Sequence, residues 1–177
     1  NHFVEIEGEN KKNTTALLVV HNNELILEKY AKGFNKENRF LGWSMAKSIM
    51  STLVGVLVKE KGVNIDEPLT MPKWGNDERK HITLNNVLQM STGINWVEDY
   101  GSISDVTKML YTNDDIYEVA TNNELEYPVG TYYEYSSGSS NILSGQIREH
   151  FETKEDYWLF PYRSLFAKLG MESMLLE

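Results

Sequence analysis

The chain has 177 residues, which is enough to bury the core of one domain or of two small interleaved ones. Its net charge of −9 argues against nucleic acid and anionic membranes as partners, because their phosphates would be repelled. The absence of cysteine excludes disulfides, thiolate zinc sites and a cysteine nucleophile, and no apolar run is long enough to span a bilayer.

Near the N-terminus, two apolar runs predict a β-hairpin. Residues 16–20 read ALLVV and residues 25–30 read LILEKY, with the turn-forming sequence HNNE between them. Short apolar runs on either side of an Asn-Asn pair are typical of antiparallel strands joined by a tight turn. An isolated two-stranded hairpin is only marginally stable.

The rest of the chain is predicted to be mostly helical, with a loop over residues 126–138. Apolar residues recur at helical spacings, and Thr83 is a candidate N-cap. Gly62, Gly93 and Gly170 are candidate helix stops. We expect helices over residues 44–61, 84–90, 104–112, 114–122, 141–151 and 157–169.

The start of the first predicted helix carries a candidate nucleophile. Ser44 and Lys47 stand at positions i and i+3, which share one face of a helix, so the hydroxyl and the amine can meet. A serine hydroxyl is a poor nucleophile until a base removes its proton. An amine acts as a base only when it is neutral, a state that burial or a nearby cation favours. A helix N-terminus also favours negative charge and offers N–H groups to an oxyanion.

The spacing alone does not establish such a site. With thirteen serines and thirteen lysines, a chain of this length contains Ser-x-x-Lys about once by chance. A capping Ser44 with a solvated Lys47 is therefore one alternative. Another treats residues 42–46 (GWSMA) as an imperfect Gly-x-Ser-x-Gly elbow, which would need His81 or His150 as its base.

Several motifs in a fixed order support the nucleophile interpretation. After the hairpin come WSMAKS, DEPLTMPKW, HITLNNVLQMSTGINW, PVGTYYEYSSGSSNILSGQI and LFAKLGM. In this order the chain resembles the serine beta-lactamase and penicillin-binding-protein-like superfamily, and within it class C-like esterases and 6-aminohexanoate-dimer hydrolases. The resemblance implies an α+β, beta-lactamase-like (DD-peptidase-like) fold. Residues 1–65 would contribute the hairpin and nucleophile helix to the α/β subdomain, and residues 66–177 would form the helical subdomain.

The resemblance implies roles for four residues. Ser44 matches the acylated nucleophile, and Lys47 matches the lysine of the Ser-x-x-Lys motif. Tyr135 matches the tyrosine of a Tyr-x-Asn/Ser motif, which shares proton transfer with the lysine. Ser137 matches the last residue of that motif, which helps to hold the substrate and the lysine. Because lysine and tyrosine would be coupled, the resemblance does not assign the base to one of them.

Other residues near these motifs have simpler predicted roles. Tyr135 itself lies in a tyrosine-rich loop, where packing is the alternative to catalysis. Ser139 and Ser140 are predicted to cap a helix. Glu98, Asp99 and Tyr100 follow the STGINW motif and are candidates for the rim of the cleft, but the favoured prediction for the two acids is a solvated surface position.

The resemblance also implies a longer chain and a third motif that the 177 residues do not contain. Members of the family are about twice as long, and their third motif, Lys-Thr-Gly or His-x-Gly, lies on a strand that supplies the second oxyanion N–H. Neither motif occurs in the 177 residues. We therefore expect an N-terminal fragment with an incomplete active site. It would be a deliberately shortened piece, a proteolytic product or one chain of a larger assembly, and in an assembly the missing half would be a separate chain or a homo-oligomer.

The resulting functional hypothesis is a serine hydrolase that forms an acyl-enzyme on Ser44. Its small-molecule substrate would be a β-lactam, an ester, a D-amino-acid peptide or a short linear amide. No cofactor is implied, and the four histidines, His2, His21, His81 and His150, show no metal-ligand spacing. The alternative is a non-catalytic binding or sensor domain on the same fold, in which a Ser44→Ala variant would keep its role. The sequence does not fix a compartment.

Overall fold

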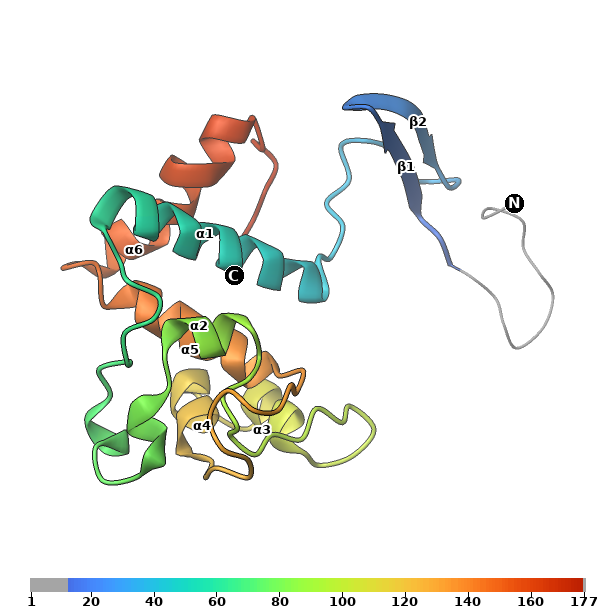
Figure 1. Ribbon diagram of the computed structural model, residues 1–177. Helices are drawn as coiled ribbons and strands as arrows, with labels where there is room; N and C mark the ends of the chain where they lie inside the picture. Colours follow the sequence, from blue (N-terminus) through green and yellow to red (C-terminus); the bar gives the residue numbers. More distant parts are fainter. Residues whose placement is uncertain (1–12, 177) are drawn as a thin grey trace. The chain divides into compact units, whose positions relative to one another are not determined.

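The computed structural model describes residues 13–176, and the chain divides into two compact units (Figure 1). One unit comprises the residues up to Leu41 together with those from Ser173 onward, and the other runs from Gly42 to Glu172. None of the helices in the described part of the chain combines the length and apolar content needed to cross a bilayer. The predicted subdomain boundary at residue 65 stays a prediction.

The first unit contains the predicted β-hairpin. Strand β1 (Ala16–His21) pairs antiparallel with strand β2 (Glu24–Tyr30). The turn residues Asn22 and Asn23 have φ values of 48° and 63°. A two-residue type I′ turn requires this left-handed conformation at both positions, and asparagine tolerates it better than most residues. The Asn-Asn pair therefore explains where the chain reverses, and the predicted hairpin is confirmed.

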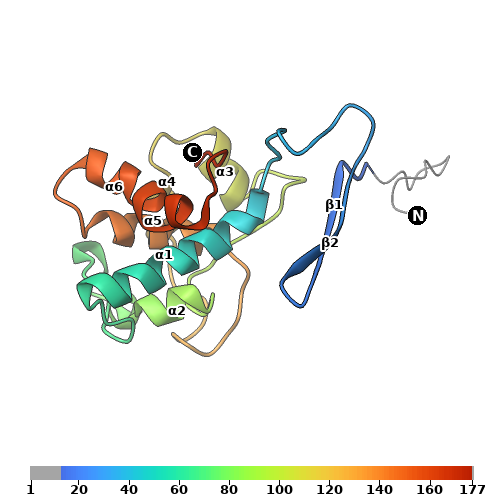
Figure 2. The ribbon, with the colours of Figure 1, turned by 90° about the horizontal axis from the view of Figure 1, so that it is seen from above.

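The second unit is helical and is organised around α5 (Ser137–Arg148). This helix contacts all five other α-helices of the unit. They are α1 (Ala46–Lys61), α2 (Leu84–Leu88), α3 (Asp105–Tyr111), α4 (Ile116–Asn122) and α6 (Lys154–Pro161). In Figure 1, α5 lies between α1 and the pair α3 and α4, and the view from above in Figure 2 shows α1 running across the unit. The predicted beta-lactamase-like α+β architecture, a hairpin followed by a mostly helical body, agrees with these elements.

The helices α1 and α5 contact each other, and both bury apolar residues at helical spacing. On α1 the buried residues are Leu53, Val54 and Leu57, and on α5 they include Ile142, Leu143 and Ile147. Residues three and four positions apart share one face of a helix, so each helix buries one stripe. Burying each such side chain contributes about 1.5–3 kcal/mol relative to leaving it exposed. This packing fixes the two helices whose N-terminal ends carry the candidate site.

Capping residues set the ends of the first helices. The helix α1 begins at Ala46 rather than at Ser44, because a 3₁₀ turn over Trp43–Met45 precedes it. Gly62 ends it with a φ of 68°, as predicted. Thr83 caps α2 as predicted, by accepting a hydrogen bond from the backbone N–H of Asn86.

The start of α5 differs from the prediction. The helix begins at Ser137, four residues before the predicted start, and its cap is Ser136, whose Oγ accepts the N–H of Ser139. The predicted capping roles of Ser139 and Ser140 are wrong, because both residues lie inside the helix. Each of these serines has the chemistry of a cap, so the sequence alone did not identify which one acts.

The last predicted helix, over residues 157–169, is instead divided into three parts. The helix α6 ends at Pro161, a π-helical turn covers Tyr162–Phe166, and a 3₁₀ turn covers Ala167–Leu169. Proline has no backbone N–H and its ring crowds the preceding turn, so an uninterrupted α-helix through this position is disfavoured. Gly170 ends the last turn with a φ of 67°, as predicted.

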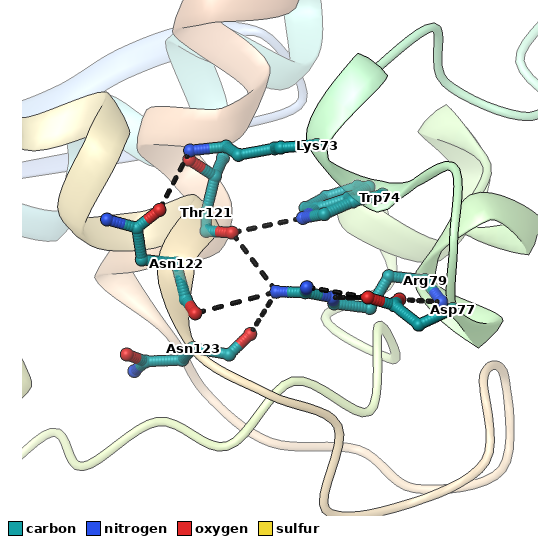
Figure 3. A network of polar contacts seen from close by, with 7 residues as sticks. All are labelled: Lys73, Trp74, Asp77, Arg79, Thr121, Asn122 and Asn123. Atoms are coloured by element: carbon teal, nitrogen blue, oxygen red, sulfur yellow. Dashed lines mark hydrogen bonds and ion pairs between the residues drawn. The ribbon is translucent and has the colours of Figure 1, made fainter.

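A polar network fastens the segment before α2 to the C-terminal end of α4 (Figure 3). The Arg79 guanidinium donates hydrogen bonds to the carbonyls of Asn123 at 2.8 Å and Thr121 at 3.4 Å. It also pairs with the Asp77 carboxylate at 2.7 Å, and the Trp74 indole donates to the Thr121 carbonyl at 3.0 Å. The last carbonyls of a helix lack intrahelical partners, so this network satisfies the end of α4 and stabilises its position.

Candidate active site

Ser44 lies on the exposed 3₁₀ turn in front of α1. Trp43, directly before it, has a φ of 44°, which a bulky side chain rarely adopts. Backbone strain of this kind costs about 1–3 kcal/mol and is concentrated at functional sites. The turn holds the Ser44 hydroxyl at the N-terminal end of a 16-residue helix, where the helix dipole favours negative charge.

Two proton-carrying groups reach the hydroxyl of Ser44. The phenol of Tyr135 donates a hydrogen bond to Ser44 Oγ at 2.6 Å, and Lys47 Nζ donates to the same atom at 3.2 Å. Lys47 Nζ also lies 4.8 Å from the centre of the Tyr135 ring. The structure therefore brings the predicted serine, lysine and tyrosine together, although the tyrosine comes from a loop 91 positions further along the chain.

Backbone hydrogen bonds hold the loop that carries Tyr135. The N–H of Glu134 donates to the carbonyl of Met90 at 2.9 Å, and the N–H of Gly130 donates to the carbonyl of Ser91 at 2.8 Å. At the start of the loop, the carbonyl of Gly93 accepts the N–H groups of Glu126 and Tyr127. Gly93 has a φ of 77°, and a Cβ there would lie 2.2 Å from the Tyr127 carbonyl oxygen. Only glycine fits this position, which supports the path of the loop toward Ser44.

Ser137 completes the predicted set. Its Oγ accepts a hydrogen bond from Lys47 Nζ at 3.1 Å, so the lysine amine contacts the hydroxyls of both Ser44 and Ser137. Ser137 is the first residue of α5, and Lys47 is the second residue of α1. The packing of these two helices therefore fixes the distance between the lysine and its second serine.

Glu98 belongs to this cluster, and its predicted role as a solvated surface acid is wrong. Its carboxylate is half-buried and accepts hydrogen bonds from both the N–H and the Oγ of Ser137. The neighbouring Asp99 is exposed and accepts hydrogen bonds from Gly101 and Ser102, as a residue of a surface turn does. A signal was present in the alternation Trp96-x-Glu98-x-Tyr100, because residues two apart in an extended segment share one side.

Hydrogen bonds keep the Glu98 carboxylate ionised. Burial raises the pKa of Glu98, but hydrogen bonds from Ser137, Trp96 and Tyr100 outweigh it, so this pKa lies below the usual value for glutamate. The pKa of Tyr100 is raised, first by burial and then by its hydrogen bond to the Glu98 carboxylate. At neutral pH the cluster therefore contains a carboxylate and a neutral Tyr100 beside Ser137.

A pocket of about 290 Å³ opens beside Lys47, between α1, α2 and α5. Its walls combine serine hydroxyls with apolar side chains. The lining residues are Lys47, Ser48, Ser51, Val87, Leu88, Met90, Ser140 and Leu143. The pocket therefore gives the lysine side chain an open, partly apolar flank.

Neither histidine that the elbow alternative requires, His81 or His150, is among the hydrogen-bond partners of Ser44 Oγ described above. His81 pairs with Glu78 at 3.8 Å, and the backbone carbonyl of His150 accepts a hydrogen bond from Lys61. The contacts of Ser44 Oγ described above come from Lys47 and Tyr135 instead. Within residues 13–176, no group of three or more histidine, aspartate or glutamate side chains is placed to hold a metal ion.

Comparison with known proteins shows the family of this chain. The profile of the beta-lactamase family matches residues 2–176. A 6-aminohexanoate-dimer hydrolase of Paenarthrobacter ureafaciens is 33% identical over 89 residues, which are 49% of this chain and 23% of that protein. A crystal structure named "putative beta-lactamase", from Bacteroides dorei DSM 17855, superposes with a TM-score of 0.66 at 18% identity and covers 89% of this chain and 46% of that one.

A second solved structure has a similar fold. It is named "putative 6-aminohexanoate-dimer hydrolase", comes from Bacillus anthracis, and superposes with a TM-score of 0.60 at 21% identity, covering 76% of this chain and 39% of that one. In each of these comparisons the matched region is less than half of the relative's length. Because the family profile extends over almost the whole sequence, the chain belongs to the beta-lactamase family, a family of serine hydrolases.

Proposed function

We propose that these residues carry the acylation machinery of a serine hydrolase, with Ser44 as the nucleophile and Lys47 and Tyr135 as its proton-transfer partners. The observation that carries the proposal is the convergence of Tyr135 OH at 2.6 Å and Lys47 Nζ at 3.2 Å on Ser44 Oγ. These distances are within the range that proton transfer between side chains requires. Ser137, which accepts from Lys47 at 3.1 Å, would hold the lysine in place.

The proposed reaction has two halves. Ser44 Oγ attacks the carbonyl carbon of an amide or ester and passes its proton to Lys47 or Tyr135, and the tetrahedral intermediate collapses as the amine or alcohol leaves with a proton. Water then attacks the acyl-enzyme ester, which releases the carboxylic acid and restores the Ser44 hydroxyl. Lys47 Nζ lies 4.8 Å from the centre of the Tyr135 ring and both groups contact Ser44 Oγ, so either group is placed to accept its proton. The Ser44 N–H, at the start of a helix, would serve as one oxyanion donor.

A short linear amide is the first substrate class to test. One relative, 33% identical over its matched region, is named a 6-aminohexanoate-dimer hydrolase. The open pocket beside Lys47, with its serine hydroxyls and apolar walls, suits a flexible substrate that combines polar amide groups and methylene chains. Esters, β-lactams and D-amino-acid peptides are the other substrate classes that the acyl-enzyme hypothesis includes.

Covalent labelling tests the proposal, because labelling requires only the first half of the reaction. The protein used is the natural protein that contains these 177 residues, at whatever length its gene encodes. It is incubated with a fluorescent penicillin and, separately, with a fluorescent fluorophosphonate, and label is measured after denaturing electrophoresis. We expect label on the wild type and on Ser164→Ala, a serine of the π-helical turn, and none on Ser44→Ala. Equal labelling of Ser44→Ala would contradict the proposal.

A further inference from the structure

We propose that Glu98 is a positioning residue, which fixes the Ser137 hydroxyl and, through it, the amine of Lys47 for proton transfer at Ser44. The inference rests on the proposed function of Ser44. It concerns a residue that the Ser-x-x-Lys and Tyr-x-Ser motifs do not include. Its basis is the number and direction of the hydrogen bonds that meet at one carboxylate.

Four donors converge on the two oxygens of Glu98. Oε2 accepts the Trp96 indole N–H at 2.6 Å and the Ser137 backbone N–H at 2.8 Å. Oε1 accepts the Ser137 hydroxyl at 2.5 Å and the Tyr100 phenol at 2.8 Å. An ionised carboxylate offers about four acceptor sites, all of which are used here. A carboxylate with this many partners has one orientation, and hydrogen bonds to an ionised group are the stronger kind.

Glu98 fixes the direction of the single hydroxyl proton of Ser137. Because this proton is directed to Glu98, the side of Ser137 Oγ that faces Lys47 presents a lone pair and accepts from Nζ at 3.1 Å. Without the carboxylate, the hydroxyl could turn and point its proton at the lysine. Glu98 therefore sets the direction of a chain of hydrogen bonds that runs from Lys47 through Ser137 to the carboxylate.

The surroundings of Glu98 hold it rigidly. Trp96 is buried, and its ring lies against the first turn of α5, where a Cβ on Gly138 would lie 2.7 Å from the ring carbons. Glycine at this position therefore permits the approach of the indole. The carboxylate also accepts the first N–H of the 12-residue helix α5, where the helix dipole favours a negative charge. The same helix turn thus binds Glu98 and carries Ser137.

The test compares acylation rates of matched variants of the natural protein. In Glu98→Gln the amide NH₂ would donate to Ser137 and turn its hydroxyl proton away, so we expect the acylation rate constant at saturating probe to fall by about 10- to 100-fold. The apparent affinity for the probe should change little, because Glu98 does not line the pocket beside Lys47. Glu98→Asp, which keeps the charge, should recover part of the rate. Glu134→Gln, an acid next to Tyr135 with the same change in charge, is the control and should acylate at the wild-type rate.

A double-mutant cycle separates positioning from a merely structural effect. Once the Ser137 hydroxyl is removed by Ser137→Ala, Glu98 has no path to Lys47, so adding Glu98→Gln should cost little further rate. The unfolding temperature of Glu98→Gln shows whether this variant folds. If it does not fold, Ser137→Ala serves as the second variant, and Ser137→Ala should slow acylation to a similar extent as a folded Glu98→Gln.

Each outcome decides between the proposals. Three results would overturn the role of Glu98 while leaving Ser44 as the nucleophile. The first is a wild-type acylation rate in a folded Glu98→Gln or in Ser137→Ala. The others are rate losses of the two substitutions that multiply independently in the double variant, and an equal rate loss in Glu134→Gln. An absence of label on Ser44 in the wild type would overturn both proposals.

Discussion

The phenol oxygen of Tyr135 lies 2.6 Å from Ser44 Oγ, although 91 positions separate the two residues. Ser44 stands two residues before α1, and Tyr135 stands two residues before α5. Because α1 and α5 pack against each other, their N-terminal ends bring the two hydroxyl groups together. The candidate site is thus a property of helix packing, and the following substitutions test it.

Replacing Tyr135 with phenylalanine removes the shorter of the two hydrogen bonds to Ser44. We expect the acylation rate constant to fall by about 10²- to 10⁴-fold, which is the usual contribution of a positioned proton-transfer group. Tyr133→Phe is the matched control, because Tyr133 is an exposed tyrosine of the same loop. The role of Tyr135 is wrong if both variants label at the wild-type rate in a stopped-time assay with the fluorophosphonate.

Replacing Lys47 with arginine distinguishes a role of Lys47 in proton transfer from a role of its positive charge. Arginine keeps the positive charge but cannot give up a proton under assay conditions. If Lys47 exchanges a proton with Ser44, Lys47→Arg should lose about 10²-fold or more of the acylation rate. Lys59→Arg, on an exposed part of the same helix, should label normally. A Lys47→Arg variant that labels as fast as the wild type would show that the lysine supplies charge alone.

Two glycines in helices should respond in opposite ways to alanine. A Cβ on Gly145 of α5 would lie 2.1 Å from a ring carbon of Tyr117, so Gly145→Ala should lower the free energy of unfolding by about 1–3 kcal/mol. A Cβ on Gly55 of α1 meets nothing within 4 Å, so Gly55→Ala should raise that free energy by about 0.5–1 kcal/mol. Urea unfolding of the 177-residue chain measures both changes. Equal effects of the two substitutions would contradict the packing of α5 against α4.

The ion pair between Asp77 and Arg79 should make stability depend on acid pH. Hydrogen bonds from the side chain and backbone N–H of Arg79 lower the pKa of Asp77 from 3.8 to about 2. A lowered pKa in the folded state contributes stability above pH 3.8, and the contribution is lost as the pH falls toward 2. Asp77→Asn should therefore unfold at a lower temperature than the wild type at pH 6, with a smaller difference at pH 2.5.

A neighbouring acid provides the control for this pH effect. Glu78 is well exposed and lies 3.8 Å from His81, an exposed pair of the kind that contributes little to stability. Glu78→Gln should have an unfolding temperature close to that of the wild type at both pH values. The contrary result is that the unfolding temperatures of Asp77→Asn and the wild type differ equally at both pH values. That result would show that the aspartate acts by capping the backbone and not through its charge.

Local features of the fold were predictable from the sequence, because each depends on neighbours in the chain. Asn22 and Asn23 suit a tight turn, Thr83 suits an N-cap, and Gly62 suits a helix stop, whatever the rest of the fold. The start of α5 was not predictable, because several serines in a row have the same capping chemistry and tertiary packing selected Ser136. The sequence predicts one helix over residues 157–169, because the apolar pattern continues through Pro161. The structure instead ends α6 at this proline, which interrupts the helix.

The candidate site was predictable only in part. The spacing of Ser44 and Lys47 allowed contact on one helical face, and Tyr135 and Ser137 entered through the resemblance to a family. Their distances depend on the packing of α5 on α1, which no local pattern encodes. Glu98 was missed because its partners lie both in its own segment, at Trp96 and Tyr100, and 39 positions away at Ser137. Such a convergence appears only when the two segments are folded together.

The location of the covalent adduct, determined by mass spectrometry, tests most directly whether Ser44 is the nucleophile. The natural protein is treated with a fluorophosphonate, digested, and its peptides are sequenced by fragmentation. We predict one adduct, on Ser44, which is absent from Ser44→Ala and forms more slowly in Tyr135→Phe. An adduct on a different residue, or a folded wild-type protein that forms none, would contradict this prediction.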